Sequence, residues 1–89
     1  MPDLPIVLSN HARDMIGERE IPLHWIEQVL RNPAFTEPDP RHPGAVRAYA
    51  PIGAFGDRML RVVYYDNGTE IRVITLFFDR RATARSRVP

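Results

Sequence analysis

Four features are missing from this sequence of 89 residues. It has no cysteine, which excludes disulfides, thiolate metal sites and cysteine nucleophiles. It has no lysine, so all twelve of its basic residues are arginines and no side-chain amine is present to act as a base or to form a Schiff base. It has neither an apolar run near the ~20 residues of a membrane span nor the basic leader of a secretory signal. We therefore expect a cytoplasmic protein with no membrane contact.

The sequence also shows no motif that indicates a metal or cofactor site. The histidines His11, His24 and His42 do not show the i, i+4 spacing of a helical metal pair, and the chain has no cysteine to complete a site. It also has no glycine-rich phosphate loop and no nucleophile elbow. We therefore predict neither a metal nor a cofactor.

The charge is unevenly distributed. Residues 79–89 hold four arginines and one aspartate, for a net charge of +3, whereas residues 1–78 hold eight arginines and ten acidic residues, for −2. Such a basic end indicates either a polyanionic or acidic partner or a solvated, disordered terminus. A chain of this length makes one domain. We assign residues 1–78 to a single domain and residues 79–89 to a basic, flexible tail.

A β-hairpin is the strongest structural signal. Two runs rich in β-branched and aromatic residues, 59–66 and 70–78, flank Asn67-Gly68, a dipeptide that favours a two-residue turn. Such a turn would place Tyr64 opposite Ile71 and Tyr65 opposite Glu70. A third strand is predicted over residues 45–50.

Two helices precede these strands. Ser9 is a good N-cap for a helix over residues 10–19, and Pro22 suits the first turn of a second helix over residues 22–31. Residues 4–8 form either an edge strand or an extended lead-in, and the proline-rich segment 32–44 is expected to be irregular. The order predicts an α+β fold with two N-terminal helices on one face of an antiparallel meander sheet of three strands, or four if residues 4–8 pair.

Alternation along the strands makes the two sheet faces different. The helix-facing side is predicted to hold Val46, Ala48, Leu60, Val62, Tyr64, Ile71, Val73 and Phe77. The opposite side, here called the outer face, is predicted to present Arg47, Tyr49, Arg61, Tyr65 and Arg72. The outer face also receives Met59, Val63, Ile74, Leu76 and Phe78. It is therefore too apolar to be fully solvated, and we expect the proline-rich loop, the tail, a second copy or a partner chain to cover part of it.

Several short motifs together resemble a known family. Ser9-Asn10-His11-Ala12-Arg13, residues 18–22 and residues 25–33 occur in the order and spacing of the small bacterial domain-of-unknown-function family 4258. The Arg-x-Tyr of residues 47–49 and the Val-Ile-Thr of residues 73–75 fit as well, so the resemblance covers about residues 6–78. Pro22 departs from the Ser-like cap usual in that family. The family in turn resembles the fold of RelE and ParE toxins, which implies an RNA-cleaving or gyrase-directed surface on the sheet.

Metal-independent RNA cleavage needs a base, an acid and cations that hold the phosphate. The arginines of the outer face are candidate phosphate ligands, its tyrosines can stack a base or donate a proton, and the base is either His11 or Glu70. The candidate catalytic residues are His11, Arg47, Arg61, Tyr65 and Arg72. The candidate nucleic-acid-binding residues are Arg47, Tyr49, Arg61, Arg72, Arg80 and Arg81.

Each candidate also has a structural interpretation. The strand arginines and Glu70 can be solvated residues with cross-strand pairing, and the tyrosines can be packing residues. His11 can simply cap its helix or form a hydrogen bond near the helix start. Two functions therefore remain open. One is a RelE-like toxin that binds or cleaves RNA, with RNA or the ribosome and an antitoxin-like protein as partners. The other is a non-catalytic interaction module or homodimer that docks through the outer face or an edge strand.

Overall fold

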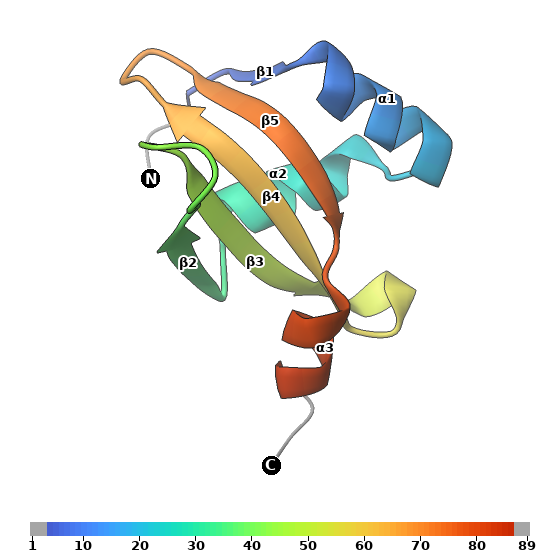
Figure 1. Ribbon diagram of the computed structural model, residues 1–89. Coiled ribbons are helices and arrows are strands. Elements are labelled where there is room, and N and C mark those ends of the chain that lie inside the picture. Colours follow the sequence, from blue (N-terminus) through green and yellow to red (C-terminus); the bar gives the residue numbers. More distant parts are fainter. Residues whose placement is uncertain (1–3, 87–89) are drawn as a thin grey trace.

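The computed structural model describes residues 4–86, which form three α-helices, a 3-10 turn and one mixed sheet of five strands (Figure 1). The elements are β1 (Ile6–Leu8), α1 (Asn10–Arg19), α2 (Leu23–Arg31), β2 (Phe35–Pro38), β3 (Val46–Ile52), η1 (Gly53–Phe55), β4 (Arg58–Asp66), β5 (Ile71–Phe78) and α3 (Arg80–Ser86). The strand order is β1-β5-β4-β3-β2, with β1 parallel to β5 and the other pairs antiparallel. The α+β class is confirmed. The simple antiparallel meander is wrong, because an additional strand pairs at each edge.

The two predicted helices are present. The Ser9 side chain accepts a hydrogen bond from the Ala12 N–H at 3.0 Å, which caps α1 as its residue type favours. α2 begins one residue later than expected, because Pro22 is its N-cap and has an extended backbone. Both helices therefore follow from local signals.

Both edge strands depend on tertiary pairing. The lead-in becomes β1, and Ile6 pairs with Ile71 of β5. The segment expected to be irregular contains β2, in which Glu37 pairs with Arg47 and Pro38 with Val46. A proline is tolerated there because β2 is at the edge of the sheet.

The hairpin forms at the predicted place with a different turn. Residues 67–70 make a four-residue loop, and the Asn67 side-chain oxygen accepts hydrogen bonds from the backbone N–H groups of Thr69 and Glu70, at 3.0 and 2.9 Å. Tyr64 therefore pairs with Val73 rather than with Ile71. A slip of two residues changes the partners but leaves each side chain on its predicted face.

A β-bulge in β5 changes the faces. Val63 pairs with Thr75 and Tyr64 with Val73, so Ile74 is an extra residue without a partner in β4. One extra residue reverses the alternation that follows it. Leu76 and Phe78 consequently belong to the helix-facing cluster, whereas Phe77 lies on the outer face, opposite to the prediction for all three.

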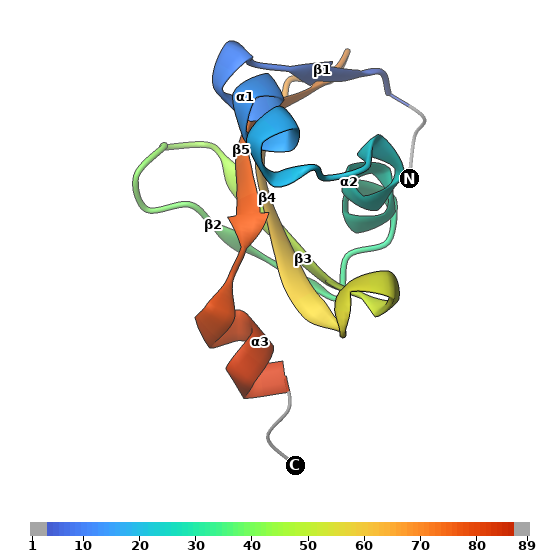
Figure 2. The same ribbon diagram turned by 90° about the vertical axis from the view of Figure 1, so that its right-hand side faces the viewer.

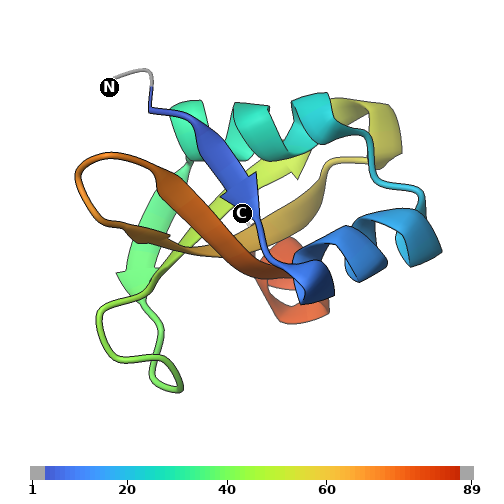
Figure 3. The same ribbon diagram turned by 90° about the horizontal axis from the view of Figure 1, so that it is seen from above.

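The main core lies between the sheet and the first two helices. α2 packs across β3 and β4, and α1 lies beside β5 and β1, whereas α3 contacts β4 (Figures 2 and 3). The most deeply buried side chains of this core include Ile26, Val29, Leu30, Ile52, Leu60, Val62, Ile71, Val73 and Leu76. The predicted helix-facing side is thus correct up to the bulge.

The basic segment that was expected to be a flexible tail contains α3. Ala82 is buried against Tyr49 and Met59, and the Thr83 hydroxyl accepts a hydrogen bond from the Met59 N–H at 2.9 Å. α3 therefore covers Met59 and Tyr49 on the outer face, and the ring of Phe35 stacks on Tyr49. The end of the predicted tail, residues 87–89, is outside the described residues.

Replacing Ser9 tests the attachment of α1 to the bulge. Its hydroxyl also donates a hydrogen bond to the Ile74 carbonyl oxygen at 2.8 Å, so Ser9→Ala removes both a cap and a bond to the bulged residue. We expect the free energy of unfolding to fall by about 1–2 kcal/mol in urea denaturation followed by circular dichroism. Asn10→Ala, at the exposed next position, is the control. Equal losses in the two variants would contradict this role.

Candidate functional site

Three neighbouring strands bring polar side chains together on the outer face. Tyr49 of β3 pairs with Arg61 of β4, and Arg47 of β3 pairs with Glu37 of β2. Since paired residues share a face of a sheet, these four side chains lie on the side opposite to α2. The prediction that Arg47, Tyr49 and Arg61 lie on the same face of the sheet is therefore correct.

The two central arginines are held by carboxylates. Arg47 donates from Nη1 to Glu37 Oε2 at 3.2 Å, and Tyr49, which is almost fully buried, donates to the same oxygen at 3.0 Å. Arg61 donates from Nη1 to the Tyr49 hydroxyl at 3.4 Å and lies 3.3 Å from Asp79 Oδ2. Burial by itself would lower the pKa of Arg47, but the hydrogen bond to Glu37 and the surrounding negative charge raise it.

The proline-rich loop adds a buried carboxylate and a histidine. Asp39 Oδ2 lies 2.8 Å from His42 Nδ1, and its other oxygen accepts from the Arg41 backbone N–H at 3.1 Å and lies 3.3 Å from Arg47 Nη2. The loop is closed by backbone bonds from Asp39 N to the Ala45 carbonyl and from Ala45 N to the His42 carbonyl. The loop thus holds the imidazole of His42 against a carboxylate.

These contacts determine the ionisation of Asp39. Burial would raise the pKa of this carboxyl, but the hydrogen bonds from His42 and from the Arg41 N–H, together with the charge of Arg47, lower it below its usual value of 3.8. Asp39 is therefore a carboxylate at neutral pH, and it orients the ring that it contacts.

His11 approaches the same region from the first turn of α1. Its Nε2 atom lies 3.1 Å from the Thr75 hydroxyl, which the bulge has placed on the outer face. A hollow of about 390 Å³ is bordered by this histidine and by the polar group described above. Its lining is formed by His11, Asp39, Arg41, His42, Arg47, Arg61, Val63, Ile74, Thr75 and Phe77. We call this space the outer hollow.

The structure brings only some of the candidate residues together. His11, Arg47 and Arg61 line the outer hollow, and Tyr49 lies beneath the arginines. Arg72 is on the same face but pairs with Glu70 at 2.9 Å beside Tyr65, near the hairpin loop, and neither Tyr65 nor Arg72 lines the hollow. Arg80 and Arg81 are exposed on α3 and do not line it either.

Sequence reasoning missed Asp39, Arg41 and His42. A usable signal was present in Asp39-Pro40-Arg41-His42-Pro43-Gly44, because an aspartate before a tight loop commonly bonds backbone N–H groups two residues on. The i, i+3 spacing of Asp39 and His42 fits the observed contact. Within residues 4–86, no group of three or more histidine, aspartate or glutamate side chains is placed to hold a metal ion.

Asp39→Asn should change the acid dependence of stability. The pKa of Asp39 in the folded protein is below 3.8, so the ionised carboxylate stabilises the folded state. This stabilisation is fully present at pH values above the pKa of Asp39 in the unfolded chain. It is lost as the pH falls through the pKa of Asp39 in the folded protein. The wild-type free energy of unfolding should therefore decrease more steeply than that of Asp39→Asn between about pH 4 and pH 2 in urea titrations. Asp14→Asn, on the exposed surface of α1, is the control. Parallel profiles for wild type and Asp39→Asn would contradict the lowered pKa.

Comparison with known proteins gives a family and little more. No curated protein matches the chain, and no solved structure matches it, so the RelE-like fold stays a resemblance. No helix formed by residues 4–86 has the length and apolar character needed to cross a membrane. One family model, described as "Domain of unknown function (DUF4258)", matches residues 8–78. This match agrees with the motifs between Ser9 and Thr75, and the chain therefore belongs to this family: it is a DUF4258 domain.

Proposed function

We propose that this protein binds RNA and cleaves it without a metal ion at the outer hollow, as a RelE-like toxin would. The observation that supports the proposal is that His11 of α1 and His42 of the proline-rich loop border one hollow together with arginines. Two histidines beside cations can supply the base, the acid and the positive charge that metal-independent phosphodiester cleavage needs, because imidazole both accepts and donates protons near neutral pH.

His42 is the proposed base. The Asp39 carboxylate contacts Nδ1, so Nε2 is the nitrogen directed away from this contact, and the negative charge stabilises the imidazolium formed after proton uptake. His42 takes the proton of the ribose 2′-hydroxyl, and the 2′-oxygen attacks phosphorus. Asp39 acts through His42 and is a positioning residue.

His11 is the proposed acid. As the bond between phosphorus and the 5′-oxygen breaks, protonated His11 gives its proton to that oxygen. The products are a 2′,3′-cyclic phosphate and a 5′-hydroxyl, so no water and no metal is consumed in this step. Thr75, 3.1 Å from His11 Nε2, holds the ring at the edge of the hollow until the substrate enters.

Arg41 is the proposed phosphate ligand. It lines the hollow and is exposed, and its guanidinium has no ion pair among residues 4–86. A phosphate at Arg47 or Arg61 would instead share each guanidinium with a carboxylate, which weakens the attraction. These two arginines therefore shape the floor of the hollow and add a smaller electrostatic contribution.

RNA cleavage in EDTA tests the proposal. We expect His42→Ala and His11→Ala each to lower the rate of cleavage of single-stranded RNA by about a hundredfold or more, because each removes one proton-transfer group. Gel analysis should show a 2′,3′-cyclic phosphate end, and a 2′-deoxy substitution at the cleaved position should block the reaction. His24→Ala, on the exposed side of α2, is the matched control.

Two outcomes would contradict the proposal. One is a purified, folded wild-type protein that leaves structured and single-stranded RNA intact. The other is cleavage that persists at the same rate in both histidine variants, which would identify a contaminating nuclease.

A second candidate is self-association through β2. This strand is an edge of the sheet, and its Phe35 side chain is 42% exposed. An exposed edge with an apolar side chain can pair with another chain. Light scattering after size exclusion would then show a dimer that Thr36→Pro returns to monomer, since proline removes a backbone donor. A wild-type monomer at high concentration would exclude this candidate.

A further inference from the structure

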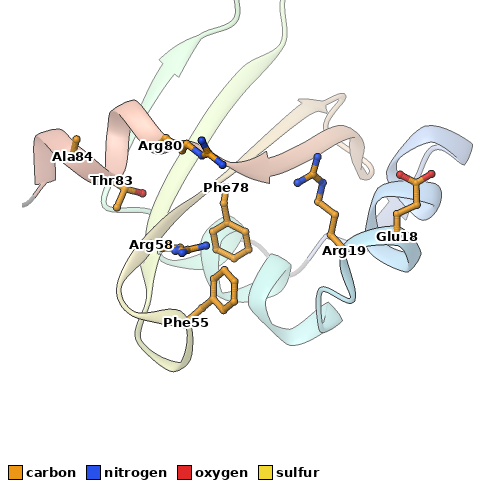
Figure 4. Close-up of a pocket in the computed structure, with 8 residues that line it drawn as sticks. All are labelled: Glu18, Arg19, Phe55, Arg58, Phe78, Arg80, Thr83 and Ala84. Atoms are coloured by element: carbon orange, nitrogen blue, oxygen red, sulfur yellow. The ribbon is translucent and has the colours of Figure 1, made fainter.

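A second hollow lies where β5 ends, between the last turn of α1 and the start of α3. It has a volume of about 620 Å³, within the range of ligand-binding sites, and none of its lining residues lines the outer hollow. Its apolar centre is the pair Phe55 and Phe78, and Arg19, Arg58 and Arg80 stand around it, with Glu18 at the rim (Figure 4). We call this space the aromatic hollow.

The arginines of the two hollows differ in their partners. Arg47 and Arg61 at the outer hollow each have a carboxylate within 3.3 Å. By contrast, Arg19, Arg58 and Arg80 form no ion pair with any residue in the described range 4–86. One carboxylate against three arginines leaves a positive rim that is available to an anionic ligand.

The aromatic floor is apolar and preformed. The Phe55 and Phe78 ring centroids are 4.7 Å apart, and Trp25 contacts both rings at 5.9 and 6.2 Å. Phe55 nevertheless stays 41% exposed, although it is a large apolar side chain. Such a surface, beside unpaired cations, has the composition of a docking site with an apolar anchor and a polar rim.

We propose that the aromatic hollow binds an acidic peptide segment of a partner protein. The segment inserts one large apolar side chain against Phe55 and Phe78, and its carboxylates pair with Arg19, Arg58 and Arg80. Charge complementarity selects the acidic segment, because arginine forms bidentate pairs with carboxylates. The site is separate from the outer hollow, so this proposal does not depend on RNA cleavage.

The ring geometry favours a peptide over a nucleic acid. Bases bind single rings by stacking on an open face. The Arg58 guanidinium lies over the Phe55 ring at 4.8 Å, and Phe78 packs against the same ring with a tilt of 40°, so the two rings form no slot for a base.

Selection from a random peptide library tests the proposal. The probe is a phage-displayed library of about twelve-residue peptides selected on the immobilised full chain. We expect enrichment of peptides that combine several aspartate or glutamate residues with a tryptophan, phenylalanine or leucine. The strongest peptide is then synthesised with a fluorescent label, and its dissociation constant is measured by anisotropy.

Charge-matched variants locate the binding. The double variant Arg19→Gln/Arg80→Gln should raise the dissociation constant of the peptide about tenfold. The control Arg13→Gln/Arg85→Gln, on the same two helices but outside the hollow, should leave this constant within about twofold of the wild-type value. Phe55→Ser should weaken it as strongly as the first pair, with folding checked by circular dichroism. Binding should persist in His42→Ala, which separates this result from RNA cleavage.

Three outcomes would overturn the proposal. The first is a set of selected peptides without an excess of acidic residues. The second is an equal rise of the peptide's dissociation constant in both double variants, which would indicate general charge attraction. The third concerns nucleic acid. A single-stranded RNA that depends on Arg19 and Arg80 and competes with the peptide would assign the aromatic hollow to nucleic acid.

Discussion

The extra residue at Ile74 is the constraint on which the rest of the structure depends. It reverses the alternation of β5, so that Thr75 and Phe77 face the arginines while Phe78 faces the helices. The outer hollow needs Thr75 to meet His11, and the aromatic hollow needs Phe78 to meet Phe55. Without the bulge, β5 would present Phe78 to the outer face and neither group of contacts would form. A hydrogen bond from the Ser9 hydroxyl to the Ile74 carbonyl anchors the first helix at this same residue.

The distribution of carboxylates separates the two hollows in chemical terms. At the outer hollow, Glu37, Asp39 and Asp79 neutralise arginines that are largely buried, and such pairs set the geometry more than they attract a polyanion. What this hollow offers is a pair of histidines, one of them held by a carboxylate, which suits proton transfer. The aromatic hollow differs, because its lining has exposed arginines around an apolar floor and, among the described residues, no histidine. These differences in charge and in side-chain type support the two separate proposals, RNA cleavage at the outer hollow and peptide binding at the aromatic hollow.

Much of the fold could be predicted because its signals are local. Ser9 caps α1, Pro22 precedes α2, and the loop at Asn67-Gly68 joins two strands, each within a residue or two of the expected place. The exact residue pairs of the hairpin could not be predicted. The Asn67 side chain accepts hydrogen bonds from two later backbone N–H groups, and the connection is therefore a four-residue loop instead of a two-residue turn. The candidate site was only partly predictable. Arg47 and Arg61 followed from strand alternation, whereas His42 depended on how a proline-rich loop closes over Asp39.

The sequence by itself determined the α+β class, the two N-terminal helices, the alternation of β3 and β4, and a chain without thiol or lysine chemistry. These depend on residue type and on periodicity along a short stretch, which act within a few residues. Only the tertiary structure decided the parallel pairing of β1, the pairing of β2, the bulge, the packing of α3 and the meeting of His11 with His42 around one hollow. Each of these joins segments distant in the chain, and their stability comes from burial and hydrogen bonds that exist only once the sheet has assembled.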